Sequence, residues 1–245
     1  MNTLSPDQEF EHPRLASLYD ALAGDRPDLE PYLSMVEEFK PSSVLDLGCG
    51  TGTLLSKLTD KNIELVGVDP AEASLNLAMQ KTVGKQITWV LGGSEAIPPV
   101  PVDMALMTGN VAQVFLSDRD WSTTLDNIHN ALTASGILVF ETRNPDAQCW
   151  KQWTRKQTFR SSTFDNIGHV DSWCDVINES LPYVSFKWTY VFESDGAILT
   201  SESTIRFRER SEIEESLTIA NFDLIDVRDA ADRPGRELVF IAKNI

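Results

Sequence analysis

Short apolar runs alternate with helical patterns along most of this chain. Five runs, each short enough for a buried strand, span residues 44–47, 65–68, 86–91, 104–107 and 136–140. Between these runs, apolar residues at helical spacing predict helices over residues 53–58, 71–81 and 120–132. This alternation predicts βαβ units and a parallel sheet.

The two ends of the chain extend the pattern. Residues 1–12 are polar and are expected to be loosely ordered, whereas residues 14–39 contain two amphipathic helical stretches. A helix over residues 211–220 and strands over residues 222–227 and 237–242 are predicted near the other end. Seven strands are therefore expected in the main sheet.

The stretch from Ser43 to Asp69 carries the strongest chemical signal. A glycine-rich turn containing Gly48, Gly50 and Gly52 follows the first strand, and Asp69 ends the second. Glycines let a backbone approach a ligand closely and adopt dihedral angles that a Cβ would forbid. Asp69 follows Gly48 at about the 20-residue spacing expected of an acid that accepts hydrogen bonds from ribose hydroxyls. Such a unit binds a nucleotide-like ligand across the carboxyl ends of its strands.

The spacing of the glycines distinguishes between ligands. It is G-x-G-x-G, whereas a dinucleotide-binding turn has G-x-G-x-x-G. The run LDLGCGTG, followed by VGVDP, resembles the first two motifs of class I S-adenosylmethionine-dependent methyltransferases. The resemblance implies a Rossmann-like, doubly wound α/β fold with a seven-stranded, mostly parallel sheet. It also implies S-adenosyl-L-methionine as cofactor, S-adenosyl-L-homocysteine as product, and cofactor contacts from Asp46, Gly48, Cys49, Gly50, Gly52, Asp69, Pro70 and Thr108.

The segment GGSEAIP, residues 92–98, departs from the pattern of this family. It resembles the segment after the third strand, in which an acid hydrogen-bonds the adenine amine. Gly93 stands where that acid would be. The resemblance therefore implies adenine contacts from backbone groups at Gly93 and from Ser94.

The tips of the fourth and fifth strands are expected to face the methyl acceptor. Asn110 and Arg143 lie there, and Arg143 either clamps an acceptor carboxylate or phosphate or pairs with a neighbouring acid. The fourth tip reads Thr-Gly-Asn, without the (Asp/Asn)-Pro-Pro-Tyr sequence that marks methylation of base amines. The runs MTGNVAQVF and FETRNP resemble a group of bacterial small-molecule-type methyltransferases.

The expected function is methyl transfer to oxygen or nitrogen of a small molecule. His12 and His169 are candidates for deprotonating the acceptor, although each could be a loop histidine without a role. A second hypothesis is a non-catalytic module that binds S-adenosylmethionine as a sensor or partner subunit. A third, a nucleotide-dependent oxidoreductase, is disfavoured by the glycine spacing. No metal site is expected, because the three cysteines lack the spacing of metal ligands.

Residues 146–209 are expected to form an inserted, antiparallel β subdomain between the fifth strand and the last helix. This stretch is far longer than an ordinary connection and is rich in strand-forming residues. Residues 1–145 and 210–245 would then form the S-adenosylmethionine-binding domain. Within that domain, residues 14–39 either form a helical lid over the cofactor or pack against the sheet.

A hairpin is predicted within this insertion. Strict alternation places Trp188 and Tyr190 on one apolar face, and Asp195-Gly196 predicts a primed two-residue turn. That turn would pair Trp188 with Ser203 and Tyr190 with Ser201. The face either roofs the acceptor pocket, with both aromatic side chains as substrate contacts, or packs only on neighbouring strands.

Composition restricts the expected partners. The chain is 42% apolar and 24% charged, as is typical of globular proteins, and its net charge is −16. No apolar run reaches the ~18 residues of a membrane span, and no signal-peptide pattern begins the sequence. A cytoplasmic location without membrane association is expected, and the oligomeric state is open between monomer and homodimer.

The charge also generates a prediction about nucleic acids. Binding to a phosphate backbone needs clustered cations that release counterions, and a field of this sign opposes it. We expect no shift of RNA or DNA in a gel at physiological ionic strength. A shift that weakens as salt is raised would contradict this expectation.

Overall fold

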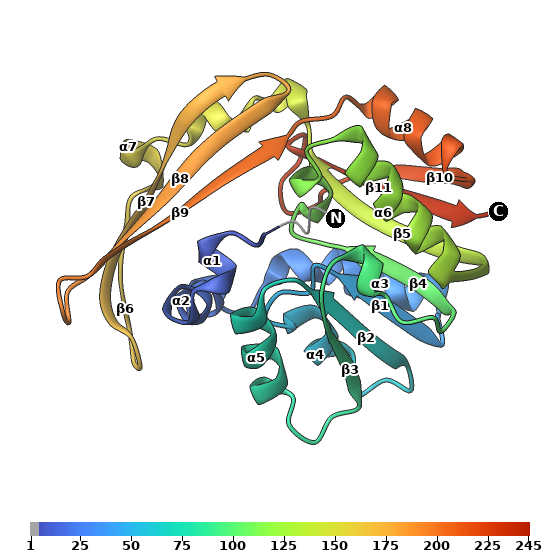
Figure 1. Ribbon diagram of the computed structural model, residues 1–245, viewed down its shortest axis with the longest axis horizontal. Coiled ribbons are helices and arrows are strands. Elements are labelled where there is room, and N and C mark those ends of the chain that lie inside the picture. Colours follow the sequence, from blue (N-terminus) through green and yellow to red (C-terminus); the bar gives the residue numbers. More distant parts are fainter. Residues whose placement is uncertain (1–4) are drawn as a thin grey trace.

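The larger of two sheets in the molecule has seven strands (Figure 1). The structure, a computed structural model, describes residues 5–245. The strands lie in the order β10-β11-β5-β4-β1-β2-β3, with β11 antiparallel to both neighbours and all other neighbouring pairs parallel. Their bounds are β1 (Ser43–Leu47), β2 (Glu64–Asp69), β3 (Ile87–Leu91), β4 (Val102–Met107), β5 (Leu132–Arg143), β10 (Phe222–Asp229) and β11 (Glu237–Asn244). The predicted Rossmann-like, doubly wound α/β fold is confirmed.

Helices bury both faces of this sheet, which explains why its strands read as nearly continuous apolar runs. Along β1, Leu45 packs into the layer that holds α6 and α8, and its neighbour Val44 packs into the layer that holds α3 and α4. The flanking helices are α3 (Glu30–Phe39), α4 (Thr53–Leu58), α5 (Glu72–Lys81), α6 (Asp118–Ala131) and α8 (Arg210–Ile219). Within residues 5–245, no helix combines the length and the apolar character needed to cross a membrane.

A second sheet of four antiparallel strands, in the order β6-β7-β8-β9, follows β5 and precedes α8 in the chain. The antiparallel insertion predicted at this point is confirmed. Its elements are α7 (Arg155–Thr158), β6 (Arg160–Phe164), β7 (Gly168–Ser180), β8 (Tyr183–Phe192) and β9 (Ile198–Arg206). Strand β9 is an edge strand of this sheet, and in Figure 1 it is the strand that lies nearest the main sheet.

The pairing of β8 with β9 differs from the predicted register by two residues. Trp188 pairs with Ser201 instead of Ser203. The predicted primed turn is wrong because Asp195 does not adopt a positive φ. Its carboxylate accepts a hydrogen bond from the backbone N–H of Ala197 (3.1 Å), which gives the loop a different closure. The apolar face is unchanged, because a shift by two residues preserves the side on which each residue lies.

The N-terminal segment lies between the two sheets (Figure 1). Leu18 is completely buried in a cluster that includes Phe192 of β8. The expectation of loose order is therefore wrong for residues 5–12, whereas residues 1–4 lie outside the described part of the chain. The helices of this segment are α1 (Gln8–Glu11) and α2 (Pro13–Ala23).

Truncating Leu18 should measure how strongly α2 is attached to the inserted sheet. We expect Leu18→Ala to lower the free energy of unfolding by about 2–5 kcal/mol, the usual cost of a cavity at a buried leucine. Urea denaturation followed by tryptophan fluorescence measures this change. Val83→Ala, at a residue that is 83% exposed, is the control and should stay within about 0.5 kcal/mol of the parent. Equal effects of the two substitutions would contradict the packing described here.

Candidate functional site

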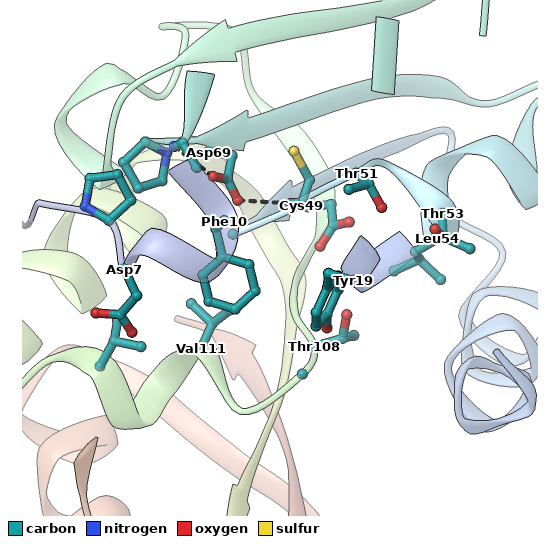
Figure 2. A pocket seen from close by; sticks show the side chains of 18 of the residues that line it. Asp7, Phe10, Tyr19, Cys49, Thr51, Thr53, Leu54, Asp69, Thr108 and Val111 are labelled. Atoms are coloured by element: carbon teal, nitrogen blue, oxygen red, sulfur yellow. Dashed lines mark hydrogen bonds between the residues drawn. The ribbon is translucent and has the colours of Figure 1, made fainter. Parts of the chain in front are cut away.

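A cavity of about 310 Å³ lies at the carboxyl ends of β1, β2 and β4 (Figure 2). Its walls combine the glycine turn, the tips of these strands, the N-terminal segment, the turn after β4 and strand β9. Most of the predicted cofactor residues line it: Asp46, Gly48, Cys49, Gly50, Asp69, Pro70 and Thr108. Lining residues that were not predicted include Asp7, Phe10, Tyr19, Arg26, Val111, Val114, Leu116 and Thr204.

The carboxylate of Asp69 fixes the glycine turn against the end of β2. Its Oδ2 accepts a hydrogen bond from the backbone N–H of Gly50 (2.7 Å), and its Oδ1 accepts one from the backbone N–H of Ala71 (2.8 Å). Asp69 is 7% exposed, and burial raises its pKa while the two hydrogen bonds lower it. Each carboxylate oxygen retains a lone pair for a further donor.

The glycines of the turn have different roles. A Cβ at Gly48 would lie 2.5 Å from Val111, and one at Gly52 would lie 2.5 Å from Trp89. These two glycines therefore allow close packing, and Gly52 does not line the cavity. Gly50 has a φ of +52° and no atom within 4 Å of an added Cβ. The half-buried backbone of Gly50 thus leaves space for a ligand to approach the turn.

Asp46 lines the cavity and, in the described part of the chain, has a buried oxygen without a hydrogen-bond partner. The residue is 1% exposed, and its Oδ1 has no hydrogen-bond partner within residues 5–245. Burial, followed by the charge of Asp69, raises the pKa of Asp46 to about 7, and the nearby charge of Arg26 lowers it. A buried acceptor without a donor is costly, and a donor group of a ligand at this position would satisfy it.

Helix α2 closes the cavity above the glycine turn. The rings of Phe10 and Tyr19 meet edge to face, with centroids 5.2 Å apart. Asp20 attaches the helix by accepting hydrogen bonds from the hydroxyl of Thr51 and the ammonium of Lys81, each at 2.6 Å. Tyr19 lies within residues 14–39, whose helical pattern left open whether they cover a ligand or pack against the sheet, and its side chain lines the cavity.

Arg26 is the positively charged residue of the cavity wall, on the turn that follows α2. Its Nε and Nη2 donate hydrogen bonds to Asp28 at 2.9 and 2.8 Å. Within residues 5–245, Nη1 donates no hydrogen bond to a side chain or to the backbone. The guanidinium therefore keeps donor capacity toward a ligand.

The two residues predicted to contact an adenine ring do not line the cavity. The hydroxyl of Ser94 lies 3.2 Å from that of Thr124 and accepts a hydrogen bond from Asn127 (3.0 Å). The backbone N–H of Gly93 donates to the side chain of Glu95 (3.1 Å). The groups offered by this segment are thus engaged within the protein.

Asn110 and Arg143 are close to the cavity but are directed to protein partners. Asn110 is 4% exposed, and its side-chain amide donates to Glu237 (3.0 Å). The Nη1 of Arg143 donates to Gln113 (2.9 Å), and its guanidinium lies 5.4 Å from the ring centroid of Trp153. The structure therefore gives both residues a role in holding the turn after β4, and neither lines the cavity.

The two candidate histidines lie outside the cavity. His12 caps α2, because its Nδ1 accepts a hydrogen bond from the backbone N–H of Arg14 (3.2 Å). His169 is partly exposed on β7, where its ring nitrogens lie 3.0 Å from the hydroxyls of Ser161 and Thr163. The geometry supports structural roles for both and gives no support to the prediction that they deprotonate an acceptor.

Trp188 and Tyr190 face the N-terminal segment. Their rings are stacked with centroids 6.1 Å apart, and Tyr190 donates a hydrogen bond to Glu9 of α1. Helix α1 therefore lies between this face and the cavity, and neither aromatic side chain lines the cavity. The inserted sheet reaches the cavity through Thr204 on the edge strand β9.

Comparison with known proteins shows similarity to methyltransferases. Residues 44–136 match a family model described as a methyltransferase domain. Over 131 residues the chain is 29% identical to a malonyl-[acyl-carrier protein] O-methyltransferase of Hahella chejuensis, an alignment that covers 52% of this chain and 46% of that protein. The chain spans about half the length of the curated relatives it matches.

Solved structures share the whole arrangement. The CcbJ methyltransferase from Streptomyces caelestis has a TM-score of 0.76 at 19% identity and covers 98% of this chain and 99% of its own. CalS10 from Micromonospora echinaspora, an amino pentose methyltransferase solved with SAM bound, has a TM-score of 0.70 at 14% identity, with coverage of 93% and 97%. At these identities the similarity shows the fold alone. Because it extends over nearly the entire chain, the fold that is shared includes the inserted sheet.

The raised pKa of Asp46 predicts a dependence of stability on pH. An acid with a pKa of about 7 in the folded protein and 3.8 ordinarily binds its proton more tightly in the folded state. It therefore destabilises the fold progressively as the pH rises from about 4 to 7, with a maximum slope of about 1.4 kcal/mol per pH unit. We expect Asp46→Asn to remove this part of the slope when unfolding is measured by denaturant between pH 4 and 8.

The control for this measurement is Asp223→Asn, at an exposed residue of β10. Its pH profile should parallel that of the parent protein. A parallel profile for Asp46→Asn as well would show that Asp46 titrates at its ordinary pKa.

Proposed function

We propose that this chain, which carries a class I S-adenosylmethionine-dependent methyltransferase domain, transfers a methyl group to oxygen or nitrogen of a small-molecule acceptor. The observation that carries the proposal is the arrangement around the glycine turn. Asp69 holds Gly50 in a conformation that leaves its backbone open, and Asp46, whose buried Oδ1 has no hydrogen-bond partner within residues 5–245, lines the same cavity. The residues present therefore fit a ligand that has hydroxyl donors at one point and an amino group at another.

The roles proposed for these residues follow from their hydrogen-bonding capacity. The remaining lone pairs of Asp69 would accept from the ribose hydroxyls of S-adenosylmethionine. Asp46 would accept from the ammonium of its methionine part, which satisfies the buried oxygen. Arg26, through Nη1, would hold the carboxylate at the same end. The methionine part is zwitterionic and needs partners of both charges, and the cavity wall supplies them in Asp46 and Arg26.

The charge of the cavity suits a cationic donor. Its charged lining residues are Asp7, Asp46, Asp69 and Arg26, so acids predominate. S-adenosylmethionine, when bound, supplies a methyl group already activated by a sulfonium cation. The contribution of this chain is then to orient donor and acceptor and to exclude water from them. Phe10 of α1 and Tyr19 of α2 would exclude water, because their rings cover the cavity.

The acceptor class is supported by two observations. The cavity is lined in part by the N-terminal segment and by Thr204 of the inserted sheet, so a small acceptor beside the donor would contact both. Among the similar proteins, KedS8 from Streptoalloteichus is a sugar N-methyltransferase and the Hahella chejuensis relative is a malonyl-[acyl-carrier protein] O-methyltransferase, so transfer to nitrogen and transfer to oxygen both occur.

Substitution of Asp69 tests the cofactor site. Asp69→Ala should weaken S-adenosylmethionine binding at least about tenfold, because hydrogen bonds to a charged group are worth about 1.5–3 kcal/mol each. Isothermal titration calorimetry measures the affinity, with NAD titrated in parallel. Asp223→Ala is the matched control and should bind like the parent. Unchanged affinity in Asp69→Ala, or tighter binding of NAD than of S-adenosylmethionine, would contradict the assignment.

The same preparations test the transfer itself. Release of S-adenosylhomocysteine is measured over a panel of amino sugars, other primary amines, phenols and carboxylates, including malonate on an acyl carrier protein. The proposal expects turnover with at least one acceptor, reduced in Asp69→Ala at subsaturating cofactor. Tight binding without turnover over the whole panel would oppose a small-molecule methyltransferase of this acceptor range.

A further inference from the structure

Asp7 lines the cavity, and the roles proposed for Asp46, Asp69 and Arg26 leave it without a function. In Figure 2, Thr53 and Leu54 lie at one side of the view and Asp7 lies at the opposite side, with Asp69 between them. Arg26 lies within electrostatic reach of Asp46 and of Tyr19, and Figure 2 shows Tyr19 on the side of Asp69 away from Asp7. The roles proposed for Asp46 and Arg26 therefore place the methionine part of the ligand on that side. The heterocyclic base must then extend toward Asp7.

The walls at this end suit a flat, largely apolar ring. Pro70 and Ala71 follow the tip of β2, and Val111 and Val114 lie on the turn after β4. All four residues line the cavity, and Pro6 of the N-terminal segment lines it as well. Among these apolar side chains, Asp7 supplies a strong hydrogen-bond acceptor.

Asp7 is held in place by the inserted sheet. Its Oδ2 accepts a hydrogen bond from the hydroxyl of Ser203 on β9, and no hydrogen bond reaches Oδ1 within residues 5–245. Two residues on, the backbone N–H of Glu9 donates to the hydroxyl of Ser201 (2.9 Å). The carboxylate therefore has one oxygen that orients it and a second with acceptor capacity toward the cavity.

We propose that the carboxylate of Asp7 accepts a hydrogen bond from the exocyclic amine of the adenine ring and so selects adenine-containing ligands. This inference rests on the proposed function. Alternative acceptors on the segment after β3 are engaged elsewhere, since Ser94 contacts Thr124 and Asn127 and neither Gly93 nor Ser94 lines the cavity. Burial raises the pKa of Asp7, and a donor amine would offset that loss of solvation.

The proposal makes a specific demand on the ligand. Replacing the amine of adenine with the carbonyl of hypoxanthine turns a donor into an acceptor at the same position. The carboxylate of Asp7 would then face another oxygen without a proton between them, which is unfavourable. Recognition of the base would thus depend on the N-terminal segment and, through Ser203, on the inserted sheet.

The experiment compares S-adenosylhomocysteine with S-inosylhomocysteine, its deaminated analogue, by isothermal titration calorimetry. The parent protein should prefer the adenine ligand by about 10- to 100-fold, as expected for a charge-assisted hydrogen bond. Asp7→Ala should bind both ligands within about threefold of each other, and Asp7→Asn should show an intermediate preference. Glu9→Gln is the matched control, because it alters the anchoring of the same segment at Tyr190 without touching the cavity wall. It should retain the preference.

Each outcome has a separate meaning. Tight binding of S-adenosylhomocysteine by Asp7→Ala with the preference intact would overturn the role of Asp7 while leaving the proposed function in place. Equal loss of preference in Glu9→Gln would also overturn it, by assigning the effect to docking of the segment. Failure of the parent protein to bind either ligand would overturn the proposed function, and this inference with it.

Discussion

The geometry of the cavity depends on one buried carboxylate, that of Asp69. It accepts hydrogen bonds from two backbone N–H groups that lie on different segments, the glycine turn at Gly50 and the start of α5 at Ala71. A charge buried to this extent is tolerated only when donors compensate for lost hydration. The same bonds that stabilise the charge therefore fix the turn relative to β2. The open backbone at Gly50 follows from this connection.

A second constraint is that neither sheet closes the cavity alone. The N-terminal segment attaches to the main domain through Asp20, which accepts from Thr51 and Lys81, and to the inserted sheet through Arg14, which pairs with Asp195 at 2.8 Å. Exposed ion pairs of this kind are individually weak. The attachment is instead dominated by the buried contacts of Leu18 with the inserted sheet. The cavity wall is thus formed by three parts of the chain: the main domain, the N-terminal segment and the inserted sheet.

The main sheet and the glycine turn could be predicted because their determinants are local in sequence. A buried parallel strand reads as an apolar run, and the turn and its acid follow at fixed spacing. The contribution of Phe10, Tyr19 and Asp7 could not be predicted in this way. Asp7 and Phe10 lie within residues 1–12, whose polar pattern predicts no helix, and the helical pattern of residues 14–39 around Tyr19 left open a lid or packing against the sheet. Only the tertiary packing shows that these side chains line the cavity. The hairpin register failed for a comparable reason, because the Asp195 side chain competes with the expected turn geometry.

If the proposed function is correct, the predominance of acids in the cavity wall affects donor and product differently. Loss of a methyl group converts a sulfonium ligand into a thioether, so the ligand loses one positive charge within the same acidic wall. The electrostatic attraction between the ligand and the acidic wall is therefore weaker for the product than for the donor. This difference becomes smaller as the ionic strength rises. On the proposed function, this electrostatic contribution would favour the donor over the product. The acids of the wall would then limit product inhibition as well as binding the cofactor.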